Sequence, residues 1–162
     1  SLDKTGGGLP EFVKNLAFQQ NKNGKISHIV TTNNFNKQKN YMNNSKKRKI
    51  YSFKRNFFKS ICYSSDFKKF INNNIEKYDL IHIHGLYRFP TTYAAYKSFK
   101  EKKPYIISPH GSLDPFLFKQ SKKNIILKRI WEFLFEFSLL KKSTAIHATC
   151  LLEKKKIKSL QL

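Results

Sequence analysis

The sequence predicts an α/β domain in which a Rossmann-like parallel sheet carries helices on both faces. Short apolar runs such as "KISHIVTT", "DLIHIHG" and "PYIIS" have the length and near-continuous hydrophobicity of buried parallel strands. Between these runs lie stretches whose apolar residues recur at helical spacing. Alternation of strands with helices is typical of a parallel sheet covered on both sides.

The first helix is expected to begin directly after three consecutive glycines and to cover residues 9–20. Its apolar positions share one helical face: Leu9, Phe12, Val13, Leu16 and Ala17. Pro10 suits the first helical turn, and Glu11 complements the positive end of the helix dipole. Asn23 and Gly24 form a helix stop, so a strand can follow at once.

The other elements follow from the same reasoning. In chain order we expect strand 25–32, an exposed Asn- and Lys-rich loop over 33–49, strand 50–53, a helix capped by Ser65, strand 79–85, helix 91–101, strand 104–108, a long helical stretch over 114–141 and strand 144–149. The helix after Ser65 places Phe67, Phe70, Ile71 and Ile75 on one face. Asp114 and Pro115 are explained as the initiation of the long helix.

Composition limits the class of protein. The 162 residues are enough for one domain with a core, and 32 Lys and Arg against 10 acidic residues give a formal charge of +22. Alone, that charge indicates a nucleic-acid or anionic membrane partner. Lys, Asn, Ile and Phe are enriched together, however, so we favour the bias of an AT-rich genome as the main cause. Cys62 and Cys150 match no metal spacing, which indicates a reducing cytoplasm.

Three polar segments are placed where open parallel sheets bind ligands, beyond the carboxyl ends of strands. Gly6, Gly7 and Gly8 precede a helix whose free N–H groups suit a phosphate. "HIHGLY" ends one buried strand, and "SPHGSLDP" ends the next. Each segment alone is weak evidence, but together they predict one binding site along one rim of the sheet.

His82 and His84 lie two residues apart on a predicted strand, so they share a face. For His82 we favour a core histidine hydrogen-bonded to backbone, whereas for His84, beside Gly85 at the strand end, a ligand contact and a structural role have equal weight. A His-x-His at a strand end also begins the site of some metal-dependent hydrolases, with His110 as a further ligand. No carboxylate cluster follows it in the sequence, so a metal site is not favoured.

His110 is the candidate catalytic residue. It follows a buried strand and Pro109, and Gly111 leaves room for a substrate against the backbone. An imidazole at this position can donate a hydrogen bond to a hydroxyl or phosphate oxygen. The alternative is a histidine that only forms a Pro-His-Gly turn, and we favour the functional interpretation.

Residues 117–141 combine lysines with an apolar face that includes Trp131. A basic amphipathic helix of this kind can lie on an anionic membrane, although packing on its own sheet is the favoured interpretation. The longest apolar stretch, "WEFLFEFSLL", is too short to span a bilayer. We therefore expect a cytoplasmic protein, with the inner face of the plasma membrane as a peripheral location.

The motifs occur in an order that resembles the family 4 glycosyltransferases of the GT-B fold. The matching segments are "SLDKTGGGLPEFVKNLA", "YDLIHIHGLY", "SPHGSLDPFLFKQSKKN" with a later Trp, and "AIHATCLLE". The resemblance is to the N-terminal, acceptor-side domain of that family, and it covers nearly all of the chain except the Asn- and Lys-rich loop.

The resemblance implies a retaining, metal-independent transferase without a cofactor, which moves a sugar from a nucleotide-sugar to an acceptor hydroxyl in surface polysaccharide biosynthesis. It implies that Gly6, Gly7 and Gly8 approach the donor diphosphate and that His110 contacts the donor sugar or its phosphates. His84 and Gly85 match the strand end that lines the acceptor cleft. The partners implied are a nucleotide-sugar donor and a saccharide or lipid-linked saccharide acceptor, and no nucleic acid.

The chain departs from the family pattern in three places. The family's first strand is expected before Ser1, and its nucleotide-sugar-binding C-terminal domain is expected after the helix that begins near Leu151. Residues 1–162 are thus expected to be an N-terminal domain that is inactive alone. "ATCLLE" differs from the more usual "ATSEAE", and Glu153 is the matching acid. A basic nucleic-acid-binding module and a His-x-His metal hydrolase remain the alternatives.

Overall fold

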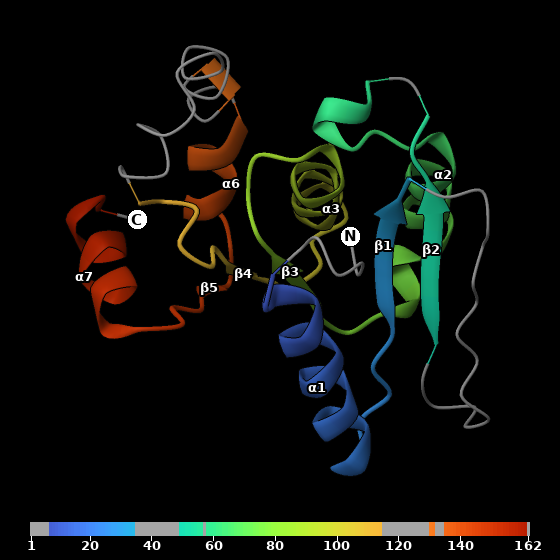
Figure 1. The fold of residues 1–162 in the computed structure, drawn as a ribbon, viewed down its shortest axis with the longest axis horizontal. Coiled ribbons are helices and arrows are strands. Elements are labelled where there is room, and N and C mark those ends of the chain that lie inside the picture. Colours follow the sequence, from blue (N-terminus) through green and yellow to red (C-terminus); the bar gives the residue numbers. More distant parts are fainter. Residues whose placement is uncertain (1–6, 35–48, 57, 115–129, 132–134, 162) are drawn as a thin grey trace. The chain divides into compact units, whose positions relative to one another are not determined.

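A computed structural model describes residues 7–34, 49–56, 58–114, 130–131 and 135–161 of the chain. The chain divides into two compact units, Ser1–Phe70 and Ile71–Leu162. Each unit is built from parallel strands that alternate with helices (Figure 1), which confirms the α/β, Rossmann-like fold class. Where one sheet was expected, the described strands form a two-stranded and a three-stranded parallel sheet.

The first unit joins a helix to two parallel strands. Helix α1 (Leu9–Lys22) begins at the N-cap Gly8 and ends at Asn23, as expected apart from two additional residues at its end. Strands β1 (Ile29–Asn33) and β2 (Ile50–Lys54) pair in parallel, with Ile29 opposite Ile50. β1 is shorter at its start than the predicted strand 25–32. Most of the predicted loop 33–49 lies outside the described residues.

A short 3₁₀ turn, η2 (Lys59–Ile61), leads to helix α2 (Ser65–Asn74). The cap of α2 is Ser64 and not Ser65, because the Ser64 hydroxyl accepts from the Phe67 N–H at 3.3 Å. Ser65 instead bonds to Asn56 through both backbone and side chain. The first part of α2 packs on β2 through aromatic rings, with Tyr51 and Phe70 centroids 4.6 Å apart and Phe53 and Phe67 centroids 6.3 Å apart.

The second unit holds the three-stranded sheet. It comprises η3 (Ile75–Lys77), β3 (Ile81–His84), α3 (Phe89–Lys100), β4 (Tyr105–Ser108), α6 (Phe137–Lys141), β5 (Ala145–Ile146) and α7 (Leu151–Ser159). The strands are parallel in the order β3-β4-β5. β5 is only two residues long, shorter than the predicted strand 144–149. Most of the predicted helix 114–141 lies outside the described residues.

The core of the second unit lies between this sheet and helices α3 and α6. Its buried members are Ile83, Leu86, Ala94, Ala95, Tyr105, Ile107, Leu113, Leu139 and Leu140. Tyr105 spans the core and donates its hydroxyl to the carbonyl of Leu139 at 2.6 Å. This bond satisfies the polar end of a buried ring, so it ties β4 to α6 at little cost.

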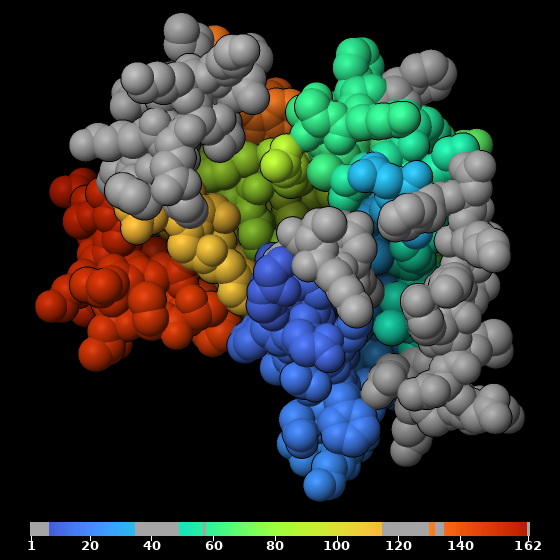
Figure 2. Space-filling view, viewed as in Figure 1, coloured from blue at the N-terminus to red at the C-terminus, as the bar shows by residue number. Residues whose placement is uncertain are grey.

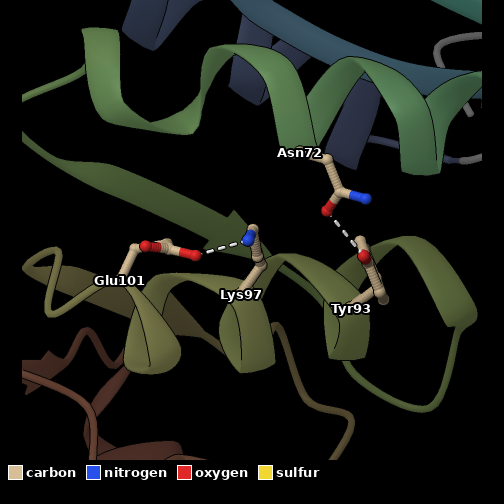
Figure 3. Close-up of polar contacts among 4 residues, drawn as sticks. All are labelled: Asn72, Tyr93, Lys97 and Glu101. Carbon is tan, nitrogen blue, oxygen red and sulfur yellow. Dashed lines mark hydrogen bonds and ion pairs between the residues drawn. The ribbon is translucent and has the colours of Figure 1, made fainter.

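Helix α3 carries the polar contacts drawn in Figure 3. The Tyr93 hydroxyl donates to the Asn72 side chain at 2.7 Å, which joins α3 to the end of α2 within the second unit. One turn further along α3, Lys97 forms an ion pair with Glu101. No helix among the described residues has the length and hydrophobicity needed to cross a membrane.

A histidine cluster at the carboxyl edge of the second sheet

Strand register places the candidate histidines at one edge of the three-stranded sheet. His84 and Ser108 are partners at the carboxyl ends of β3 and β4. The pairing continues one step further, because the Gly85 N–H donates to the Ser108 carbonyl at 2.8 Å. His110 follows β4 by two residues and His147 follows β5 directly. The carboxyl ends of parallel strands share an edge, so the imidazoles of His84, His110 and His147 gather here, together with that of His82 in β3.

His84 and His110 are hydrogen-bonded to each other, with 3.0 Å between His84 Nδ1 and His110 Nε2. Such a bond requires one of these nitrogens to carry a proton and the other to lack one. The pair therefore holds one proton between the two rings when both imidazoles are neutral. The structure brings together the two histidines that were predicted separately as site residues.

His82 belongs to a second chain of hydrogen bonds. Its Nε2 lies 2.8 Å from the Ser108 hydroxyl, which lies 2.9 Å from Nδ1 of His147. The hydroxyl has one proton, so it donates to one neutral ring and accepts from the other, and the tautomers of His82 and His147 are coupled. The His82 ring is thus bonded to a side chain, where a bond to backbone was expected. His82 and His84 do share a face, with ring centroids 4.1 Å apart.

Burial keeps the rings of His82, His84 and His110 neutral. Desolvation, together with the neighbouring histidines, lowers the pKa of His84 to about 3 and that of His82 to about 4. Burial also lowers the pKa of His110, although the nearby Glu153 opposes this shift. At neutral pH these three rings therefore offer hydrogen-bond donors and acceptors without positive charge.

The loops that follow β3 and β4 contain left-handed backbone. Gly85 has φ of +86°, and the consecutive residues His110 and Gly111 have φ of +51° and +76°. A residue with a side chain is strained in this region, whereas glycine is not. His110 is therefore held in an uncommon conformation, and the contacts around it must maintain that conformation.

One of those contacts comes from Glu153, a residue in the first turn of α7. Glu153 is only 7% exposed. One carboxylate oxygen accepts from the Gly111 N–H at 2.6 Å. The other accepts from the N–H and hydroxyl of Thr149 at 2.7 and 2.8 Å. Burial alone would raise the pKa of Glu153, but these donors, together with nearby His110, lower it. The group is therefore a carboxylate at neutral pH.

A second buried carboxylate holds the loop after β3. Glu136 is 2% exposed and accepts from the Tyr87 N–H at 3.1 Å, the Thr92 hydroxyl at 2.6 Å and the Trp131 indole N–H at 3.2 Å. Tyr87 has φ of +61°, so this loop also contains a strained non-glycine residue. Each of the two loops at the histidine cluster is thus bonded through a backbone N–H to a buried glutamate.

The predicted glycine loop belongs to the first unit. Gly6 lies outside the described residues, whereas Gly7 and Gly8 precede α1, with Gly8 as its N-cap. The first N–H groups of a helix have no acceptor within the helix and could bind an anion. Pro10, in this first turn, has no N–H group to contribute. Glu11 adds a negative charge that is paired with Lys14 at 3.2 Å. The common binding site of the glycine loop with His84 and His110 stays a prediction.

Ser108, His147 and Glu136 were not among the predicted site residues, and Glu153 had no predicted role. His147 lies within the predicted strand 144–149, as His84 lies within the predicted strand 79–85, so its position near a strand end was a usable signal. Glu136 lies within the aromatic run "WEFLFEFSLL", where nothing in the pattern marks it as buried and bonded. No group of three or more His, Cys, Asp or Glu side chains that could hold a metal ion occurs among the described residues.

Parallel strands with polar side chains and strained loops at their carboxyl ends define a Rossmann-like domain with a candidate binding site at that edge. A comparison with protein families matches residues 6–161 to Glycosyltransferase Family 4. The match covers nearly the whole chain, and the chain belongs to this family, as its motifs had suggested. Comparisons with curated proteins and with solved structures gave no match.

Proposed function

We propose that this chain is the acceptor-side domain of a retaining, metal-independent glycosyltransferase that acts in surface polysaccharide biosynthesis. Membership of the family implies transferase activity with a nucleotide-sugar donor and an acceptor. The observation that carries the proposal for the site is the His84–His110 hydrogen bond at the carboxyl ends of two adjacent parallel strands.

In the proposed reaction, the bond from the anomeric carbon to the departing diphosphate breaks, and a bond from that carbon to the acceptor hydroxyl oxygen forms. The acceptor proton passes to the departing phosphate oxygen, so no other acid or base is consumed. Negative charge grows on the diphosphate while the sugar becomes oxocarbenium-like. Oriented N–H groups near the diphosphate would stabilise this charge.

His110 is proposed to supply one such N–H to the donor sugar or its phosphates. The pKa of His110 is lowered, which supports a role as a neutral hydrogen-bond donor. A neutral ring does not attract anions from solution without selectivity, as a charged ring would. The hydrogen bond from His84 constrains the ring plane of His110, so less rotational freedom is lost when the substrate binds.

The glycines have complementary proposed roles. Gly85 and Gly111 follow the two strands, and apart from each glycine and its chain neighbours, no heavy atom of the described residues lies within 4 Å of the position that a Cβ would occupy on either. A sugar ring can therefore approach the backbone at these points. Gly6, Gly7 and Gly8 are proposed to contact the donor diphosphate, with the N-terminus of α1 behind them.

Substitution of His110 tests the proposal. In the intact enzyme, His110→Ala should lower the rate of sugar transfer by about two to three orders of magnitude, as does the loss of one preorganised donor to a developing anion. The assay is release of the nucleoside diphosphate together with labelled acceptor product, and circular dichroism verifies the fold. His28→Gln, at a histidine outside the cluster, is the matched control and should retain the wild-type rate. A near-wild-type rate for folded His110→Ala would exclude His110 from the site.

A further inference from the structure

We propose that Glu153 is a positioning residue, which holds His110 in its active orientation by fixing the backbone of Gly111 from helix α7. The inference rests on the proposed role of His110 in sugar transfer. Glu153 does not itself need to contact the substrate, since it acts on the residue that follows His110.

The two carboxylate oxygens of Glu153 accept from different parts of the chain. Oε2 accepts from the N–H and hydroxyl of Thr149, which satisfies donors at the start of its own helix. Oε1 instead accepts from the N–H of Gly111 at 2.6 Å, across 42 residues of sequence. Helix capping explains the first set of bonds and leaves the second unexplained.

The Glu153 side chain is buried although it belongs to a largely exposed helix. Helix α7 lies at the surface in Figure 2, and its first two residues, Leu151 and Leu152, are each 77% exposed. Glu153, next to them, is only 7% exposed. A carboxylate is costly to bury and an exposed glutamate would cap the helix equally well, so the inward placement needs the bond to Gly111 to offset its cost.

The loop after β4, to which Glu153 is bonded, contains strained backbone. His110 and Gly111 are both left-handed, with φ of +51° and +76°. A histidine leaves this region readily unless its surroundings hold it there. The Gly111 N–H lies in the peptide unit that directly follows His110, so a bond at this atom limits rotation of the His110 backbone and hence the direction of its ring.

Three variants of the intact enzyme separate positioning from stability. Glu153→Gln keeps the size of the side chain, but its single amide oxygen can accept from only one of the two sets of donors, and the loss of the negative charge weakens that bond. Thr149→Val removes only the hydroxyl bond at the helix start and leaves the Gly111 bond in place. Glu101→Gln removes a charge of the same kind from the ion pair on α3 and is the control.

We expect Glu153→Gln to lower kcat by about tenfold to a hundredfold with KM changed by less than about twofold, because misplacing a catalytic group acts on the transition state. Thr149→Val and Glu101→Gln should keep kcat within about twofold of wild type. Independently of activity, amide hydrogen exchange at Gly111 should become faster in Glu153→Gln and remain slow in the other two variants.

A double-mutant cycle decides the mechanism. If Glu153 acts through His110, adding Glu153→Gln to His110→Ala should cost little further rate, because the group it positions is already absent. Fully additive losses, or unchanged Gly111 exchange in folded Glu153→Gln, would overturn the positioning role. If His110→Ala itself retains full activity while Gly111 exchange responds as expected, the proposed function fails and the structural link between Glu153 and Gly111 stands.

Discussion

Acidification should destabilise the protein through His84, because its ring is buried among other imidazoles. The folded pKa of about 3 lies below the ordinary value of 6.5, so the unfolded chain binds a proton that the folded chain excludes between these two pH values. The contribution of His84 to stability is complete above pH 6.5 and is lost progressively as the pH falls toward 3. A group whose folded pKa was raised would give the opposite slope.

The size of the effect follows from the two pKa values. At pH 5, His84 alone removes about 2 kcal/mol of unfolding free energy relative to pH 7.5, because about 1.36 kcal/mol is lost for each pH unit below the unfolded pKa of 6.5 as long as the pH stays above the folded pKa. His82, with a folded pKa of about 4, shifts in the same direction. Because His82 is more exposed, we discount its part for solvent screening to about 1 kcal/mol.

Urea denaturation at pH 7.5 and pH 5.0 measures this loss. His84→Gln should lose about 2 kcal/mol less than wild type over the same pH interval, since glutamine does not titrate. Asn72→Ala is the control, because it removes the hydrogen bond from Tyr93 without removing a titrating group. It should lower stability equally at both pH values. An identical pH dependence in wild type and His84→Gln would refute the argument that His84 is kept neutral by burial.

Two further substitutions test the bonds that support the histidine cluster. Glu136→Ala removes the buried carboxylate that accepts from the Tyr87 N–H, the Thr92 hydroxyl and the Trp131 indole N–H, and we expect it to cost about 3–5 kcal/mol in chemical denaturation. A loss below about 1 kcal/mol would contradict a structural role for Glu136. Ser108→Ala removes the hydroxyl between His82 and His147 and should cost about 1–3 kcal/mol, and NMR of labelled histidine should show both rings changing together. A change in only one ring would argue against coupled tautomers.

Local pattern was sufficient for the elements of the fold. Strands β2, β3 and β4 and helix α1 lie close to where apolar runs and helical spacing placed them, because burial on both faces requires continuous hydrophobicity in a parallel strand. The ends of the elements depend on tertiary contacts, which local pattern does not contain. Ser64 and Ser65 are equally good caps as residue types, and the tertiary bonds between Asn56 and Ser65 distinguish them.

The candidate site shows the same division. The strand ends pointed to His84 and His110, since topology alone brings the carboxyl ends of parallel strands to one edge. The bond between their rings depends on register and on the left-handed backbone of His110, which no local pattern specifies. Glu136 and Glu153 look like surface glutamates in the sequence, and their burial appears only when the loops are folded against them.

The sequence by itself determined the α/β class, the order of strands and helices, and the family, because hydrophobic periodicity and short motifs are local properties of the chain. Tertiary structure alone decided which polar groups meet. Hydrogen bonds such as those between Gly111 and Glu153 and between Ser108 and two histidines join residues separated by 26 to 42 positions. Their geometry depends on packing to within a few tenths of an ångström, and amino-acid pattern does not carry that information.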